Sequence, residues 1–414
     1  MKKKHKHIFI TTIIAICSFL LGVWTTSTFG SQKVKDARLQ IFIDIYNTLK
    51  ENWYYGDDET LDKMMENVYG AIYDYNVDPY TYFIAAPIEG EEQEKTYGIG
   101  IVAVRNYDKE QTNYNDPILN ELGILVIKTY KDSPSYNAGI KPLDYIVGVT
   151  ENDNYISFNG MKYSEIRQYI VGALDSKATF KIKRNDEFLD IELTRNAYSI
   201  STANFNEVFN ETYKSSVVLE IEEFASTTGK EVGELLKTIS NPKDKDLIID
   251  LRDNPGGYIS TLANIASYFL PENLSVLTYE DKDGNKYSAE KTKKCDKYEF
   301  NSITVLLNGS SASASEAFTL CLNYYEEYLN EFNIVGEKSY GKGIAQTEVN
   351  LSNGGTIHYT FAKVYDPGGE LSIHKEGITP DYEIPLESYE IGNAFSYYTS
   401  ITNQLEKSII YAIN

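Results

Sequence analysis

Hydrophobic and polar residues follow three different patterns along the chain, and each pattern predicts a different kind of structure. Apolar side chains recur at helical spacing over residues 35–75. From about 97 to 195 the apolar runs are short and bounded by turn residues, as in "GILVIKTY" and "ATFKIKR", which is typical of β-strands. After Ala197, strands such as "KDLIIDLR" alternate with helical stretches such as "ISTLANIASYFL". This alternation of strands and helices predicts an α/β core with a largely parallel sheet.

These patterns, together with the N-terminal and C-terminal segments, divide the chain into six parts. The α+β stretch is long enough for a self-contained domain, and the α/β stretch is long enough for a second one. We expect a basic segment at 1–7, a transmembrane signal anchor at 8–30, an N-terminal helical region at 31–95, an α+β domain at 96–196, an α/β core at 197–388 and a C-terminal helix or tail at 389–414.

The first thirty residues favour a membrane anchor. Four lysines among residues 2–6 precede an apolar run, 8–30, that carries no charge. A helix of some 22 residues spans roughly 33 Å, enough for a bilayer core. The basic flank predicts a cytoplasmic N-terminus, with the rest of the chain outside. A cleaved signal peptide, which would make the protein secreted, needs a shorter apolar core and an A-x-A-like site, so the uncleaved anchor is favoured.

The net charge and the cysteine content exclude some classes of function and of site. The chain carries 60 acidic and 39 basic residues, a net charge of −21, which repels nucleic acid and excludes a DNA-binding role. Cys295 and Cys321 lie outside the apolar segment. They could pair in an oxidising compartment or stay two isolated buried thiols, and the sequence leaves both open. Because no cysteine-rich ligand spacing occurs, no metal is predicted.

A run of alternating serines, "GSSASASEA" at 309–317, raises the question of a nucleophile. It lies between an apolar strand and a helix that starts near Ala314. Such a turn stands at the carboxyl edge of a parallel sheet, where α/β proteins place their sites. The helix N-terminus also offers unpaired N–H groups that can hold an oxyanion. Helix capping alone explains the run too, because Glu316 follows Ser313 by three residues, as in a capping box.

A serine nucleophile needs a base, and lysine is the better candidate here. Beyond the N-terminal segment the histidines are His358 and His374; neither has an obvious orienting carboxylate, and we interpret both as structural. Lys342 stands between Gly341 and Gly343. Glycines permit close backbone approach, and burial lowers the pKa of a lysine, so an enclosed amine could be neutral and act as a base.

The segment 336–343, which contains Lys342, partly matches the sequence pattern of a phosphate-binding loop. Gly336, Gly341 and Lys342 have the right spacing, but Gly343 replaces the hydroxyl residue that would hold magnesium. The next residues also read as a strand, whereas that loop should open a helix. We therefore set nucleotide binding aside.

Seven segments, in order, resemble motifs of the C-terminal processing (tail-specific) serine peptidases, which combine a Ser–Lys site with a PDZ domain. The resemblance runs from about Leu49 to Pro385. It implies an α/β peptidase core of the ClpP/crotonase-like type with an inserted PDZ (α+β) domain at 96–196, N-terminal helices and one N-terminal transmembrane helix. The matching segments are "VDPYTYF", "YGIGIVAV", "SPSYNAGIKPLDYIVGV", "LIIDLRDNPGGY", "LLNGSSASASEAF", "VGEKSYGKGIAQ" and "GITPDYEIP".

By this resemblance Ser313 is the nucleophile, Lys342 is the general base and Gln346 orients the lysine amine. The oxyanion would be held by the backbone N–H groups of Ala314 and Gly257. The mechanism needs no metal or cofactor. Ser313 and Lys342 are 29 residues apart, a few more than the family pattern, and we expect "NYYEEYLNEFN" to carry the extra residues in a loop.

The resemblance also implies how substrates are recognised. Backbone groups of Gly98, Ile99, Gly100 and Ile101 would hold the C-terminal carboxylate of a peptide, which adds a strand along 99–104. The expected partners are therefore proteins or peptides with free C-termini, together with the membrane and, through the N-terminal helices, a second copy in a homodimer. The alternative is a PDZ scaffold with an inactive core, which the presence of all three site residues disfavours.

Overall fold

The computed structural model describes residues 37–52, 58–71, 77–84, 97–104 and 123–413, except 152, 186, 199, 353 and 390–392. The anchor predicted at 8–30 lies outside these residues. None of the helices in the described part combines the length and the apolar composition that a bilayer requires.

The chain forms two compact units, and the first comprises residues 1–86 with 350–357. The helical spacing predicted over 35–75 corresponds to two helices in this unit, followed by a short strand. The rings of Tyr69 and Phe83 are 5.3 Å apart. Gly355 allows the chain to pass close to Phe83, since a Cβ there would lie 2.7 Å from the ring. The elements are α2 (Ala37–Asn52), α3 (Asp58–Gly70) and β1 (Tyr82–Ile84).

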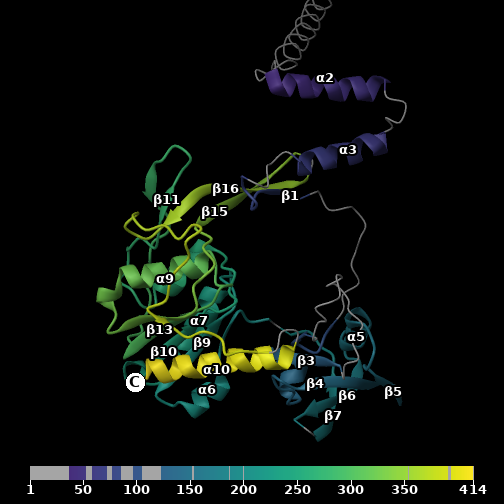
Figure 1. Cartoon of the computed structure of the whole chain (residues 1–414), viewed down its shortest axis with the longest axis vertical. Coiled ribbons are helices and arrows are strands. Elements are labelled where there is room, and N and C mark those ends of the chain that lie inside the picture. The colour runs from purple at the N-terminus through teal and green to yellow at the C-terminus, as the bar shows by residue number, and fades with distance from the viewer. Residues whose placement is uncertain are drawn as a thin grey trace, which may run out of the picture. The chain divides into compact units, whose positions relative to one another are not determined.

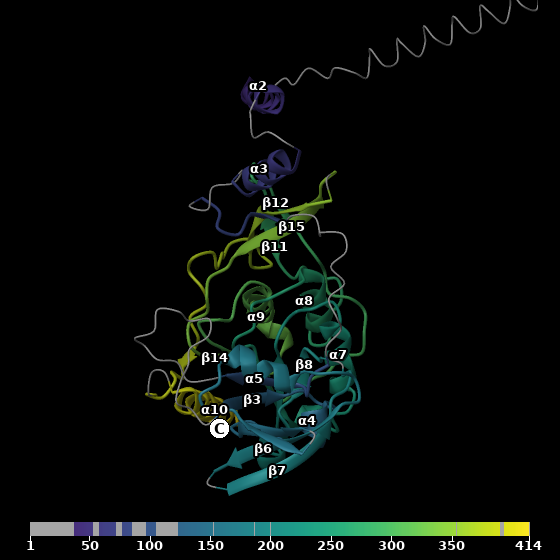
Figure 2. The ribbon, with the colours of Figure 1, turned by 90° about the vertical axis from the view of Figure 1, so that its right-hand side faces the viewer.

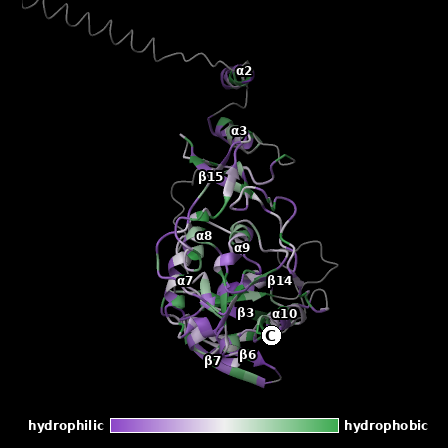
Figure 3. Cartoon of the chain, turned by 90° about the vertical axis from the view of Figure 1, so that its left-hand side faces the viewer, coloured by the Kyte–Doolittle hydropathy of each residue, from purple (hydrophilic) through white to green (hydrophobic). Residues whose placement is uncertain are grey.

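The second unit, 87–349 with 358–414, contains the predicted α+β domain as a twisted antiparallel sheet. Hydrophobic and hydrophilic positions alternate along β7 (Figure 3), which buries one face of the sheet. The stretch "MKYSEIRQYIVGAL" has helical apolar spacing, but its helix ends at Ile170, because Val171 adopts an extended backbone. The sheet order is β2-β3-β4-β6-β7 with β5 on β4; the elements are β2 (Ile101–Val104), β3 (Ile124–Thr129), α4 (Pro134–Asn137), β4 (Tyr145–Glu151), β5 (Asn154–Ser157), α5 (Tyr163–Ile170), β6 (Lys177–Arg184) and β7 (Glu187–Thr194).

One residue of this domain departs from the usual backbone rules. Leu143 has a φ of +69°, in the left-handed region that favours glycine. Its N–H donates to the Val126 carbonyl at 2.8 Å and so joins the turn to β3. A leucine is strained in this conformation, and the tertiary hydrogen bond holds it there.

The largely parallel sheet predicted after Ala197 is confirmed. Five strands run parallel, and β8 adds an antiparallel edge, so the sheet is mixed. The order is β17-β14-β13-β10-β9-β8, with β8 (Ala203–Phe205), β9 (Ser216–Ile221), β10 (Asp246–Asp250), β13 (Ser302–Leu307), β14 (Phe332–Gly336) and β17 (Tyr382–Glu383).

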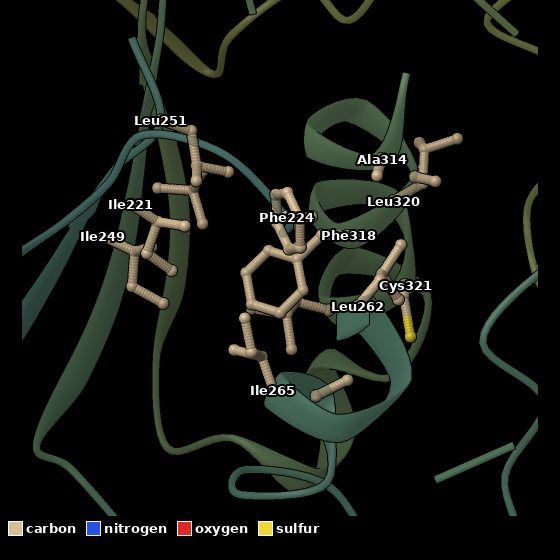
Figure 4. Close-up of a cluster of buried hydrophobic side chains, with 14 of the residues drawn as sticks. Ile221, Phe224, Ile249, Leu251, Leu262, Ile265, Ala314, Phe318, Leu320 and Cys321 are labelled. Atoms are coloured by element: carbon tan, nitrogen blue, oxygen red, sulfur yellow. The ribbon is translucent and has the colours of Figure 1, made fainter. Parts of the chain in front are cut away.

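Helices cover both faces of this sheet, as its continuous apolar strands require (Figures 1 and 2). Ile249 and Val305 face α7, α8 and α9, whereas Ile248 and Leu306 face α10. In the larger core the ring of Phe224 lies 5.7 Å from that of Phe318 (Figure 4). The helices are α6 (Glu207–Thr212), α7 (Thr228–Leu236), α8 (Ile259–Ala266), α9 (Ala314–Tyr324) and α10 (Ala394–Ala412), with single turns at Pro242–Asp244 and Glu326–Tyr328.

An antiparallel sheet adjoins the core and receives the segment that follows Lys342. That segment is a strand, as predicted, and not the helix that a phosphate-binding loop would open. Strand β16 pairs with both β11 and β15. The strands are β11 (Thr278–Glu280), β12 (Lys286–Ser288), β15 (Ile344–Asn350) and β16 (Thr356–Tyr365).

Candidate active site

Three loops leave the carboxyl ends of three neighbouring parallel strands, β10, β13 and β14. This edge is where α/β sheets place their sites. The first two loops are joined where Ala312 N–H donates to the Asn254 carbonyl at 3.0 Å. The third joins them where Tyr340 N–H donates to the Ser311 carbonyl, also at 3.0 Å. The strand order therefore brings the serine run, the "DNPGG" loop and the "GKG" loop together.

Ser313 lies at the first turn of α9 in a strained conformation. Its φ is +58° and its ψ is −116°, values that non-glycine residues rarely adopt. The residue is half-buried, while Ala312 and Ala314 beside it are buried. The turn thus leaves the serine, and not its neighbours, accessible at the sheet edge.

A buried carboxylate joins the serine turn to the lysine loop. Glu316 is fully buried, and its Oε2 accepts the backbone N–H groups of Ser313 and Lys342, each at 2.9 Å. Its Oε1 accepts the Ser339 hydroxyl at 2.6 Å and the Gly341 N–H at 2.7 Å. The capping-box spacing predicted the contact with Ser313. The contacts across to the lysine loop were not predicted, because nothing local in the sequence indicates them.

The glycines on either side of Lys342 allow the backbone of another segment to approach this loop closely. A Cβ on Gly343 would lie 2.5 Å from the His374 backbone nitrogen, and one on Gly341 would lie 3.0 Å from that of Gly377. Lys342 itself is half-buried. Gln346 is also half-buried and lies on β15, four residues beyond the lysine.

The two glycines of the "DNPGG" loop occupy different places. Gly256 lies directly against the serine turn, since a Cβ there would be 2.7 Å from both Ser313 Cβ and Ala314 N. Its own N–H donates to the Asn254 side chain at 2.8 Å. The N–H groups of Gly257 and Ala314 donate to no acceptor within the described residues. Both are thus available to an oxygen atom of a bound molecule.

The histidines differ from expectation in one respect. His358 Nδ1 lies 3.1 Å from a carboxylate oxygen of Glu348, so the view that neither histidine has a carboxylate partner is wrong for His358. Glu348 lies on β15 and His358 on β16, and these two strands are paired. His374 contributes backbone to the enclosure of the lysine loop.

Buried charges lie behind the "DNPGG" loop. Arg252 donates hydrogen bonds from its Nε and Nη2 to the carboxylate of Asp250, and both side chains are 7% exposed. Burial, and then Asp250, raise the pKa of Glu220, the neighbour of Asp250 in the sheet register. Burial lowers the pKa of Lys128, which comes from β3 of the α+β domain and pairs with Glu222. Charged side chains of the two domains therefore lie close to one another near Asp250.

The α+β domain carries a second group of open backbone donors. The N–H groups of Gly98, Ile99 and Gly100 donate to no acceptor within the described residues. The Ile99 carbonyl is fixed by the Ser135 N–H at 2.8 Å, and Gly100 has a φ of +80°. Ile101, the fourth residue predicted to bind peptide, begins strand β2. Successive free N–H groups of this kind form a site for an anion.

The two cysteines outside the N-terminal segment are free thiols. Cys321 is buried on α9, and Cys295 is partly exposed. Burial raises the pKa of Cys321 to about 12 and also raises that of Cys295.

Comparison with known proteins identifies the family. Residues 216–384 match the model of peptidase family S41. A protein of Staphylococcus epidermidis described as a CtpA-like serine protease is 28% identical over 389 residues, which cover 92% of this chain and 72% of that protein. The carboxy-terminal processing protease CtpA of Bacillus subtilis is 28% identical over 398 residues, which cover 94% of this chain and 79% of that protein.

A solved structure supports the same fold. The crystal structure of a Bacteroides fragilis protein described as an S41 protease superposes with a TM-score of 0.54 at 14% identity, covering 86% of this chain and 91% of that one. The family match includes all three loops of the site and extends through β17. The chain therefore belongs to peptidase family S41 and is a serine peptidase.

Proposed function

We propose that the protein is a membrane-anchored C-terminal processing endopeptidase that cuts protein substrates with Ser313 as nucleophile and Lys342 as general base. The observation that carries this proposal is the Glu316 carboxylate, which binds the backbone N–H groups of both residues. A shared buried anchor keeps the two loops in one fixed relation, as a nucleophile and its base require.

The chemistry follows from these positions. Ser313 Oγ attacks the peptide carbonyl carbon while the neutral Lys342 amine takes the hydroxyl proton. The ammonium so formed then protonates the leaving amine as the C–N bond breaks, and water hydrolyses the acyl-enzyme by the reverse sequence. Gln346 would orient the amine through its side-chain oxygen.

The oxyanion of each tetrahedral intermediate would be held by Gly257 and Ala314. Their N–H groups lack acceptors within the described residues and flank the contact of Gly256 with Ser313. Preorganised donors of this kind stabilise developing charge at no cost of reorganisation.

Substrate tails would bind to the α+β domain, acting as a PDZ domain. The open N–H groups of Gly98, Ile99 and Gly100 suit a terminal carboxylate, and Ile101 begins the strand along which a peptide would add. The buried Ile99 favours an apolar last residue.

The anchor and the dimer are further parts of the proposal. The uncharged run 8–30 and its basic flank support a single membrane span with the catalytic part outside the cell. On α2, Leu39, Ile41 and Ile45 are more than half exposed, which favours a helix-mediated homodimer. Carbonate extraction of membranes tests the anchor, and sedimentation velocity of wild type against Ile41→Glu tests the dimer.

A time course of cleavage by mass spectrometry tests the activity. An unstructured peptide with an apolar C-terminus should be cut by the wild type and left intact by Ser313→Ala. Equal behaviour of the two proteins would favour a PDZ scaffold instead. The rate should also rise from neutral to alkaline pH as Lys342 loses its proton, and a flat profile would remove the lysine from the role of base.

A further inference from the structure

A tyrosine from outside the α+β sheet lies beside the open N–H groups of Gly98–Gly100. Tyr198 belongs to the connection from β7 to β8, which leads from the α+β domain to the core. A Cβ on Gly98 would lie 3.8 Å from the Tyr198 hydroxyl oxygen and 4.0 Å from the Gly100 backbone nitrogen. One small region of space is therefore bordered by a side-chain hydroxyl and by an open backbone donor.

The ring of Tyr198 is held by packing and not by its hydroxyl. It stacks on the ring of Tyr130, with the two centroids 6.0 Å apart and an angle of 25° between the planes. It also contacts the Gly98–Gly100 loop, since a Cβ on Gly100 would lie 3.4 Å from a carbon of the Tyr198 ring. The hydroxyl makes no hydrogen bond with any residue that the structure describes. Packing thus fixes the ring and leaves its polar end available.

The same tyrosine, Tyr130, also fixes the loop. Its backbone N–H donates to the Gly100 carbonyl at 3.0 Å, and the Ser135 hydroxyl donates to that carbonyl at 2.9 Å. Tyr130 therefore holds the loop through its backbone and Tyr198 through its ring. The open N–H groups and the hydroxyl keep one relative position, so they form a preorganised set of donors.

This set of donors suits a carboxylate. Its two oxygens accept about four hydrogen bonds, so the three open N–H groups of the loop leave room for a further donor. Burial, and then Tyr130, raise the pKa of Tyr198 above its ordinary value, so the hydroxyl keeps its proton at neutral pH and can donate it. A hydrogen bond to an ionised acceptor is also stronger than one between neutral groups.

The cations packed near the loop are already paired. Arg195 lies against Gly172, is 2% exposed and donates to the Glu151 carboxylate. Lys128, 5.5 Å from the centroid of the Tyr130 ring, pairs with Glu222 of the core. Both charges are balanced within the protein, which leaves neutral donors to hold a bound carboxylate.

We propose that the Tyr198 hydroxyl donates a hydrogen bond to the C-terminal carboxylate of a bound tail. This contact rests on the tail binding proposed above, and it comes from outside the α+β domain. The connection between the domains then takes part in recognising the tail. A tail that ends in a neutral amide lacks the ionised acceptor and gains little from the tyrosine.

Acid and amide forms of one peptide test the proposal without cleavage. The full-length chain carrying Ser313→Ala, in detergent micelles, is titrated with an unstructured labelled peptide that ends in an apolar residue with a free carboxylate. The same peptide with a C-terminal amide is measured in parallel, and fluorescence anisotropy gives both Kd values. The acid form should bind more tightly than the amide form.

Adding Tyr198→Phe should raise the Kd of the acid form about tenfold, the effect of one charge-assisted hydrogen bond, and leave that of the amide form unchanged. The phenylalanine keeps the stacking on Tyr130, so the unfolding temperature should also stay unchanged. The matched control is Tyr155→Phe, at an exposed tyrosine on β5, which should change neither Kd.

The outcomes separate this contact from the tail binding beneath it. An unchanged Kd of the acid form in Tyr198→Phe would overturn the role of Tyr198 and leave tail binding intact. An equal rise for both forms would also overturn it, because Tyr198 would then support the shape of the site and not the carboxylate. If neither form binds the Ser313→Ala parent, tail binding itself fails, and the tyrosine contact fails with it. Cleavage of the acid peptide by the wild type reports independently on the peptidase.

Discussion

One carboxylate oxygen, Oε2 of Glu316, lies 2.9 Å from the backbone nitrogen of Lys342. The same atom accepts the Ser313 N–H at 2.9 Å. A single buried acceptor thus connects the turn of the nucleophile to the loop of the base, which are 29 residues apart in sequence. We regard Glu316 as a positioning residue, because it binds the backbones of both residues.

Glu316→Gln should therefore damage catalysis more than substrate binding. The amide replaces one acceptor oxygen with an NH₂ group that faces N–H donors, so the two loops lose part of their shared anchor. We expect kcat to fall by about 10²-fold with a smaller change in KM. The free energy of unfolding should fall by about 1–3 kcal/mol. Steady-state kinetics and thermal unfolding measure both effects.

The matched control is Glu327→Gln. Glu327 is exposed in the turn after α9 and should change neither quantity. If Glu316→Gln kept the wild-type kcat, the carboxylate would have no role in positioning.

Gly256→Ala tests the contact between the "DNPGG" loop and the serine turn. The new Cβ would lie 2.7 Å from Ser313 Cβ, so the loop or the turn must move. We expect kcat/KM to fall by about 10²-fold, since small displacements of reacting groups have effects of this size. Activity on a chromogenic peptide is the measurement.

Gly284→Ala separates crowding from backbone strain. Gly284 also has a positive φ, +81°, but a Cβ there would meet nothing within 4 Å. The Gly284→Ala variant should have a lower free energy of unfolding than the wild type and keep full peptidase activity. Equal activity losses in the two variants would mean that backbone strain, and not the contact with Ser313, explains the effect.

The fold could be predicted where one local pattern decides the structure. Buried parallel strands are continuous apolar runs, so "LIID" and "ITVLL" were recognised as strands. The apolar pattern alone would extend α5 beyond Ile170, because Val171 is apolar like the helical positions before it yet adopts an extended backbone. Apolar spacing does not distinguish these two states.

The site could be predicted as far as motifs and local spacing allow. The capping-box spacing indicated that Glu316 lies near Ser313, but its bond to Lys342 depends on the parallel pairing of β13 with β14. The contact of His358 with Glu348 likewise depends on the pairing of β15 with β16. Contacts made by strand pairing have no local sequence signal.

The two described cysteines should differ in reactivity. Cys321 is fully buried, and burial raises its pKa to about 12, so the thiolate is scarce and shielded. Cys295 is partly exposed, although its Sγ donates to the Ser267 carbonyl at 3.1 Å. Iodoacetamide at pH 8 should modify Cys295 slowly in the native protein and Cys321 only after unfolding. Peptide mapping reads the two sites separately, and rapid native labelling of Cys321 would mean that the core around α9 opens readily.

The buried Glu220 should cost stability at neutral pH. Burial, followed by the neighbouring Asp250, raises its pKa above the ordinary 4.5, despite the opposing charge of Lys128. Between pH 4.5 and the folded pKa, the folded protein holds a proton that the unfolded chain releases. The contribution of Glu220 to the free energy of unfolding therefore falls as the pH rises from 4.5 through the folded pKa.

Glu220→Gln should accordingly stabilise the protein at neutral pH by about 1 kcal/mol. The amide oxygen can still accept the hydrogen bond that Asn206 donates to Glu220 at 2.6 Å, so only the charge is removed. The gain should shrink as the pH is lowered toward 4.5, because Glu220 is then protonated in the folded state and increasingly protonated in the unfolded chain as well. Thermal unfolding of both proteins between pH 4.5 and 8 measures it. Glu223→Gln, at an exposed neighbour, should show no such trend. A Glu220→Gln variant that loses stability at neutral pH would mean that the ionised carboxylate is needed to balance Lys128 and Arg252.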